Sequence, residues 1–240
     1  MLKLLFDSFE TIRHAETLGA LHLEMDRFAK RMGFNCFAFA LRIASPSRSS
    51  QQVILTDYPR EWTERYVAGS YFTKDPIVYY CERGCLPAIW DERTFHGEGS
   101  REFWEEAESY GVRSGLSFAV HERPGTAGIF SLSRDQNLDL SAQDLAALAG
   151  RAQVFASVVH HAVIRIKLPT VLPVAHRDLT PRERECLKWA AEGKTALEIG
   201  RAVGVAERTV IFHLNNAMHK LGAVNRTQAV VRALSLNLLF

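Results

Sequence analysis

The chain has 240 residues, of which 47% are apolar and 23% are charged, with 29 basic against 27 acidic side chains. This composition predicts a folded protein with a sizeable core and excludes a largely disordered chain. Beyond residue 175 basic residues outnumber acidic ones by 10 to 6, whereas residues 1–175 hold 19 basic and 21 acidic ones. A basic C-terminal part is the direction expected of contact with phosphates, although a solvated surface can show the same pattern.

The cysteines and the apolar runs argue against metal binding, membrane insertion and export. The four cysteines form no CxxC pair and have no partner ligands at zinc-like spacing, so we interpret them as reduced, packed thiols and expect no metal or cofactor. No apolar run approaches the roughly 20 residues of a membrane-spanning helix. The first residues lack the pattern of a signal peptide. We therefore expect a cytoplasmic protein with no membrane partner.

The first part of the chain alternates between helical and extended patterns. The periodicity and turn signals predict helices over residues 9–32, 59–69, 75–84, 100–111 and 141–166. They predict strands over residues 36–43, 51–58, 115–122 and 127–135. Helices around four or five strands joined by short turns are typical of an α/β fold, here an α-β-α sandwich with an antiparallel sheet.

Two prolines mark the boundary between two domains. Pro169 and Pro173 each disfavour helix in the preceding residue, so the helix that ends near Ile166 should give way to an extended connector. The predicted divisions are a first domain over residues 1–166, a linker over 167–176 and a second domain over 177–240.

The second domain is predicted to be a small all-α unit of four helices. Thr180 and Glu183 form a capping box around a proline at the first helical position, and Thr195 and Glu198 form another. Gly204 then supplies a tight turn before a longer helix. A short helix, a glycine turn and a longer helix make a helix-turn-helix.

The longer helix, within residues 207–222, carries two different faces. At the helical period one face is apolar and is expected in the core: Val210, Leu214, Ala217 and Leu221. The outward residues mix charge, amide and apolar groups: Arg208, Ile211, Phe212, Asn215 and His219. In the DNA major groove an amide suits adenine and apolar side chains suit thymine methyl groups. The alternative is a capping subdomain whose outward apolar residues pack on the first domain.

Phosphate contacts are expected from the flanks of this helix-turn-helix. Such contacts position a protein on DNA without reading the sequence. The candidates begin the second helix or lie on the third: Lys194, Thr195, Thr209 and Lys220.

The second domain resembles the helix-turn-helix of the LuxR-type regulators along its whole length. The resemblance rests on the patterns L-T-x-R-E-x-E-x-L, G-K-T and T-V-x-F-H-x-x-N. It implies that the third helix enters the major groove and that Ile211, Phe212 and Asn215 face bases. Ile211 stands where the family often has a polar residue, which affects the operator sequence. Ala206 replaces a usual Ser N-cap, which should weaken the helix start by about 0.5–2 kcal/mol.

The first domain gathers aromatic residues with few polar ones between residues 58 and 104. A packed core is the simplest interpretation of such a cluster. Asp75, however, stands between apolar segments, and a buried carboxylate needs a donor. A phosphorylated receiver domain is not favoured, because the required acidic cluster is absent from the strand ends.

The first domain also resembles the autoinducer-binding domain of quorum-sensing LuxR proteins, in the order and spacing of Trp62, Tyr66, Asp75-Pro76, Trp90 and Gly115. The resemblance implies an N-acyl-homoserine lactone in a cavity between the sheet and one helical layer. It implies that Trp62 donates to the lactone carbonyl and that Asp75 accepts from the ligand amide. It further implies that the acyl carbonyl is bound by Tyr58 and Ser131 and that the head group is covered by Tyr66 and Trp90.

These resemblances predict a transcription factor that binds a lactone and, as a homodimer, promoter DNA. RNA polymerase or an accessory protein is left open as a further partner, as is a ligand-independent or accessory-protein-stabilised regulator of the same fold. A lactone-processing enzyme is not favoured, because GxSxG and HExxH patterns are absent and His160 and His161 point to different faces of one helix.

Overall fold

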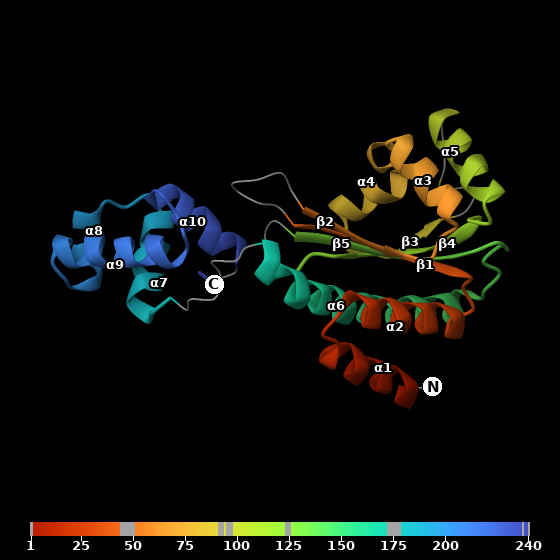
Figure 1. The fold of residues 1–240 in the computed structure, drawn as a ribbon, viewed down its shortest axis with the longest axis horizontal. Coiled ribbons are helices and arrows are strands. Elements are labelled where there is room, and N and C mark those ends of the chain that lie inside the picture. The colour runs from red at the N-terminus through yellow and green to blue at the C-terminus, as the bar shows by residue number, and fades with distance from the viewer. Residues whose placement is uncertain are drawn as a thin grey trace. The chain divides into compact units, whose positions relative to one another are not determined.

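The structure is a computed structural model that describes residues 2–43, 51–90, 94, 98–122, 126–171, 179–236 and 238–239. The chain divides into two compact units, with the division between Ile166 and Lys167. Each unit is described by itself (Figure 1). Within the described ranges, no helix has both the length and the apolar character needed to cross a membrane.

The first unit is built on a five-stranded sheet with the strand order β2-β1-β5-β4-β3. The strands are β1 (Cys36–Ile43), β2 (Gln51–Thr56), β3 (Ala88–Trp90), β4 (Ser114–Val120) and β5 (Thr126–Arg134). β4 pairs antiparallel with β5 and with β3, as predicted for the sheet. The three-residue β3 was not predicted, because so short a strand has no periodicity to detect.

Helices cover both faces of the sheet, so the predicted α-β-α sandwich is confirmed (Figure 1). α2 (Leu18–Arg31) and α6 (Ala142–Val171) lie on one face, and α3 (Arg60–Ala68), α4 (Pro76–Arg83) and α5 (Glu98–Ser109) lie on the other. The α2/α6 face is closely packed: the rings of Phe28 and Phe155 stack with centroids 3.7 Å apart, against the fully buried Phe130.

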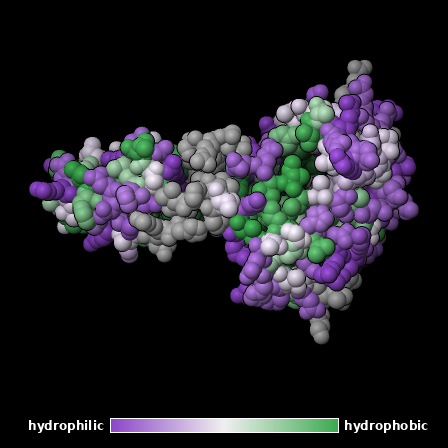
Figure 2. Space-filling model, in the orientation of Figure 1, coloured by the Kyte–Doolittle hydropathy of each residue, from purple (hydrophilic) through white to green (hydrophobic). Residues whose placement is uncertain are grey.

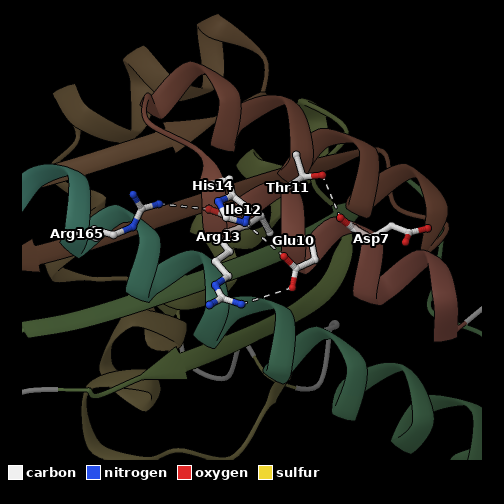
Figure 3. A network of polar contacts seen from close by, with 7 residues as sticks. All are labelled: Asp7, Glu10, Thr11, Ile12, Arg13, His14 and Arg165. Atoms are coloured by element: carbon white, nitrogen blue, oxygen red, sulfur yellow. Dashed lines mark hydrogen bonds and ion pairs between the residues drawn. The ribbon is translucent and has the colours of Figure 1, made fainter.

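The N-terminal helix predicted over residues 9–32 is wrong as a single helix. The structure has α1 (Leu2–His14) and α2, with a break at the Thr17 N-cap, whose hydroxyl accepts from the Ala20 N–H at 3.2 Å. At the end of α1, Arg165 of α6 donates to the Ile12 carbonyl oxygen at 3.4 Å (Figure 3). It also donates to the Ala15 carbonyl oxygen at 2.7 Å. The break leaves the first N–H groups of α2 without helical acceptors. The Thr17 side chain satisfies one of them, so it stabilises the start of a new helix.

The end of α6 also differs from the prediction. The helix continues past Ile166 to Val171, so the first five residues of the predicted extended linker are helical. The Thr170 hydroxyl donates to the Lys167 carbonyl oxygen at 2.7 Å, within the last turn of the helix. The rest of the predicted linker, residues 172–176, lies outside the described residues.

The second unit contains α7 (Pro181–Ala191), α8 (Ala196–Val203), α9 (Glu207–Lys220) and α10 (Arg226–Ser235). Both predicted capping boxes are present, at Thr180 with Glu183 and at Thr195 with Glu198. Gly204 ends α8 with a φ of 73°, a conformation that favours glycine. The predicted helix-turn-helix therefore corresponds to α8 and α9.

The four cysteines are free thiols, but they are not all packed. Cys81 and Cys186 are buried, Cys36 is partly buried, and Cys85 is exposed. The expectation of packed thiols is therefore wrong for Cys85, which follows the end of α4.

Candidate ligand cavity and nucleic-acid interface

A cavity of about 400 Å³ lies in the first unit between the sheet and the layer formed by α3, α4 and α5. Its volume is in the range of small-molecule sites. Its lining includes all six residues that the sequence predicted as ligand contacts: Tyr58, Trp62, Tyr66, Asp75, Trp90 and Ser131. The residues come from helix α3, the loop before it, the N-cap of α4 and two strands, so only the folded chain brings them together.

Asp75 is held in place at the start of α4. Its Oδ1 accepts from the Ile77 N–H at 2.8 Å, and its Oδ2 accepts from the Tyr66 hydroxyl at 3.0 Å. Burial raises the pKa of Asp75 to about 6, so the side chain is mostly a carboxylate at neutral pH. Two carboxylate oxygens accept about four hydrogen bonds, so room remains for another donor.

Trp62 is the centre of an aromatic cluster on the same cavity. Only 2% of it is exposed, and its ring lies 5.8 Å from Tyr66, 5.7 Å from Phe103 and 5.5 Å from Tyr110 between centroids. Among the residues that the structure describes, no hydrogen-bond partner is found for its indole N–H. An unsatisfied donor in an aromatic wall fits a ligand oxygen better than it fits a closed core.

Trp90, Ser117 and Ser131 form a chain of hydrogen bonds across the sheet. The Trp90 indole N–H donates to the Ser117 hydroxyl at 3.1 Å, and the Ser117 and Ser131 hydroxyls lie 2.7 Å apart. Gly115 makes this possible, because a Cβ there would lie 2.5 Å from the Trp90 ring. Ser117 was missed at the sequence level; only its pairing with Ser131 across β4 and β5 marks it.

The cavity wall is tied together by a second polar group that the sequence did not single out. Glu106 on α5 accepts from Arg65 of α3 at 2.5 Å and from the Tyr71 hydroxyl of the short 3-10 helix η1 (Tyr71–Thr73). Hydrogen bonds from Tyr71 and Arg65 lower the pKa of Glu106. Glu106 thus connects three segments of the helical layer over Trp62.

The outward face of α9 is open within the second unit. Val210, Leu214 and Ala217 are buried as predicted. Ile211 is 44% exposed and Phe212 is 60% exposed. Arg208 and Asn215 are exposed beside them. The second unit therefore leaves large apolar side chains in solvent, which is the pattern expected of a contact surface.

The predicted flanking residues divide into two groups. Lys194 and Thr195 are exposed and Thr209 is partly exposed, so they remain available for a partner. Lys220 is already paired: its Nζ donates to Glu183 Oε2 at 2.7 Å, with the two side chains 24% and 4% exposed. A carboxylate that is nearly buried requires a cation, so Lys220 neutralises Glu183 at the N-cap of α7, and its phosphate contact stays a prediction.

The start of α9 lacks a capping side chain, as the sequence predicted. Ala206 occupies the N-cap and makes no side-chain hydrogen bond there. The three other helices of this unit each have a capping Thr or Asn: Thr180, Thr195 and Asn225. The helix with the exposed apolar face thus has the weakest start of the four.

Two protein families match this chain. Residues 17–163 match the family described as autoinducer binding domain, and residues 177–233 match the bacterial regulatory proteins of the luxR family. The chain is similar to the transcriptional activator protein AnoR of Acinetobacter nosocomialis, with 34% identity over 88% of each chain. It is also similar to the transcriptional activator protein AhyR of Aeromonas hydrophila, with 32% identity over 97% of this chain and 90% of the other.

Solved structures share the fold. Escherichia coli SdiA superposes with a TM-score of 0.78 over 100% of this chain and 99% of its own, at 23% identity, which speaks for the fold alone. The N-acylhomoserine lactone dependent LuxR family transcription factor CepR2 of Burkholderia cenocepacia superposes with a TM-score of 0.56 at 28% identity. That match covers 70% of this chain and 96% of the other.

Proposed function

This chain belongs to the LuxR family of bacterial regulatory proteins, and we propose that it binds an N-acyl-homoserine lactone in its first domain and promoter DNA through its second. The family and the named relatives are transcriptional regulators, so the chain is a regulator and not an enzyme. One observation carries the choice of ligand. A carboxylate with spare acceptor capacity and an indole N–H without a described partner line the same aromatic cavity.

The proposed contacts satisfy every polar group of a lactone amide. Trp62 donates to the lactone carbonyl, and Asp75 accepts from the amide N–H. Tyr58 and Ser131 donate to the acyl carbonyl, while Tyr66 and Trp90 cover the head group. Burial raises the pKa of Tyr58 and of Tyr66, which keeps both hydroxyls protonated and able to donate. A buried amide without such partners would lose about 1–3 kcal/mol for each unsatisfied group.

The proposed DNA contacts lie on α9 and at the start of α8. The exposed outward residues of α9 read base edges in the major groove: Arg208, Ile211, Phe212 and Asn215. Phosphates are contacted by Lys194, Thr195 and Thr209. The excess of basic residues beyond residue 175 supports contact with DNA.

Ligand and DNA are coupled, in this proposal, through a homodimer. A lactone at 100 times its dissociation constant adds about 2.7 kcal/mol to the stability of the bound domain. Two stabilised protomers then present two α9 helices at half-site spacing. The protein acts in the cytoplasm, where the promoter is, and RNA polymerase is a further proposed partner.

A second candidate is a regulator of the same fold that works without ligand or with an accessory protein. It is favoured by the hydrogen bonds of Asp75 with Tyr66 and of Trp90 with Ser117, because these bonds hold the cavity wall through side chains of the protein itself. Purification of a soluble dimer that binds its promoter without lactone would support this candidate.

Thermal unfolding with and without a panel of acyl-homoserine lactones tests the proposed function. We expect at least one lactone to raise the midpoint of the first domain in a concentration-dependent way. Mass spectrometry of the small molecules that co-purify should identify a ligand of the same class. The absence of any shift across the panel would contradict lactone binding.

A further inference from the structure

Strand β1 forms part of the floor of the cavity. Alternate residues of a strand point to opposite faces, so Ala38 and Ala40 face the cavity while Phe37 and Phe39 are buried on the other face. Both positions that face the cavity therefore carry the smallest apolar side chain. These small side chains leave a shallow groove along the strand.

The strands beside β1 show the same order from polar to apolar. On β5 the cavity side carries Ser131 and then Ile129, and on β2 it carries Thr56 and then Ile54. The hydroxyl groups lie at the end near Trp90 and Asp75. Moving away from them, the next residues on these strands are the aliphatic Ile129 and Ile54, as an acyl chain would require once it has left the amide; Gln52 follows Ile54 on β2.

A second cavity of about 50 Å³ adjoins the first. The two share six residues: Ala40, Gln52, Ile54, Phe72, Val78 and Ile129. Ala38, by contrast, lines only the first cavity. Figure 2 shows a strip of apolar surface over β2 and α4, the two elements that hold Ile54 and Val78. Ala40 thus lines both cavities, at the place where they adjoin.

We infer that Ala40 sets the acyl-chain length of the ligand, because its small side chain lets the chain pass from the first cavity into the second. This inference rests on the proposed lactone site. From Ser131 to Gly128, which lines the second cavity, is three strand residues or about 10 Å. Three bonds of an extended chain span about 3.5 Å, so about eight or nine bonds cover that distance. Octanoyl and decanoyl chains therefore fill both cavities, whereas a butanoyl chain ends before Ala40.

The far end of the second cavity is polar. Arg42 and Glu82 form an ion pair at 3.2 Å, and the His121 ring nitrogen lies 3.0 Å from the Cys81 carbonyl oxygen. A methylene placed among these groups gains less than one placed beside Ile129. Affinity is therefore expected to rise with chain length up to octanoyl or decanoyl and to stop rising with dodecanoyl and longer chains.

The test measures the dissociation constants of the full-length protein for butanoyl-, hexanoyl-, octanoyl-, decanoyl- and dodecanoyl-homoserine lactone, by calorimetry or tryptophan fluorescence. Each methylene buried in the second cavity should tighten binding about fourfold. Ala40→Leu should weaken octanoyl binding at least about tenfold and butanoyl binding less than about threefold. Ala38→Leu is the matched control: it narrows the first cavity only, so it should weaken all chain lengths alike.

The outcomes separate this inference from the proposed function. Failure of every lactone to bind would overturn the proposed function and the inference with it. Binding that does not depend on chain length, or an Ala40→Leu variant that loses butanoyl and octanoyl binding equally, would overturn the inference alone. If the leucine variants do not fold, the chain-length series of the unaltered protein decides: an optimum at butanoyl or hexanoyl contradicts an open passage at Ala40.

Discussion

The two units differ in what their apolar side chains are used for. In the second unit the inward faces of the helices meet in one cluster that includes Leu187, Ile199 and Val210, and the outward Ile211 and Phe212 remain exposed. In the first unit the helical layer of α3, α4 and α5 leaves a cavity of about 400 Å³ against the sheet. The second unit thus offers a surface, whereas the first offers an interior. A ligand that binds in the cavity of the first unit must therefore be small and largely apolar.

The units also differ in how their polar groups are satisfied. In the second unit, local capping boxes and the Glu183–Lys220 pair complete the helix ends. In the first unit, the cavity retains a donor on Trp62 and spare acceptor capacity on Asp75. We expect the second unit to be stable by itself, and the first to gain stability when a ligand completes its hydrogen bonds.

The largest expected effect is in the second unit. Glu183→Ala removes both a capping side chain and the partner of Lys220, and it should lower the free energy of unfolding by about 3 kcal/mol. Glu198→Ala removes the same capping role at an exposed site, so it should cost clearly less. Urea denaturation followed by circular dichroism measures both. Equal losses would show that the Lys220 contact contributes nothing.

Asp75→Asn should separate ligand binding from folding in the first unit. Asparagine also caps helices well, so α4 should be retained, but the amide accepts more weakly than a carboxylate. Lactone affinity should fall by about 2 kcal/mol, or roughly thirtyfold, whereas the unliganded melting temperature at neutral pH should not fall, because Asn carries no charge to bury. DNA binding by the second unit should be intact. Unchanged lactone affinity would remove Asp75 from the site.

Two substitutions at the α8–α9 surface should have effects of different kinds. Asn215→Ala should reduce discrimination between operator and altered sites by about 1–2 kcal/mol, because an amide reads a base edge. Lys194→Ala should weaken binding to all sequences and lessen the slope of log affinity against log salt by about 1. Fluorescence anisotropy at several salt concentrations distinguishes them. A changed base preference in Lys194→Ala would mean that flank and groove are misassigned.

The raised pKa of Asp75 predicts opposite pH trends for two forms of the first unit. The pKa is about 6 in the folded protein against an ordinary 3.8. Between these values the folded unit binds the proton more tightly than the unfolded chain, so without ligand its free energy of unfolding rises as pH falls from about 6 towards 4. A lactone amide binds the carboxylate, so affinity should fall up to about tenfold between pH 7 and pH 5. Melting curves at several pH values, with and without lactone, test this. Asp75→Asn should abolish both trends.

The smallest expected effect is a gain. Ala206→Ser supplies the missing N-cap of α9 and should raise the free energy of unfolding of the second unit by about 0.5–1 kcal/mol. Affinity for DNA should be little changed, since the outward face of α9 is the same. Thermal unfolding checks the gain. No gain would indicate that the Ala206 backbone already satisfies the helix start.

Interactions between residues close together in the sequence could be predicted, whereas interactions between distant residues could not. Thr195 and Glu198 stand three residues apart, so their capping box is readable in the sequence and is present in the structure. The ion pair of Lys220 with Glu183 was not predicted, because the two residues lie 37 positions apart and no local pattern connects them. The break at Thr17 was missed because apolar periodicity continues on both sides of it.

The residues that line the cavity also differ in whether the sequence alone identifies them. Its aromatic and acidic contacts stand out by residue type, and the structure brings all six predicted residues to one cavity. Ser117, Ala38 and Ala40 carry no such mark, because serine and alanine are common residues throughout the chain. Their place depends on which strand faces point at the helical layer, and that requires the order and register of the sheet.

The Arg165 clamp on α1 bears on any effort to work with a shortened protein. The family match begins at residue 17, yet the two carbonyl acceptors of Arg165 and the fully buried Ile12 all precede it. A fragment trimmed to the match would uncover the surface against which Ile12 packs and remove both carbonyl acceptors of Arg165. Self-association of such a fragment would then result from the truncation. The oligomeric state of the native protein should therefore be measured on chains that retain α1.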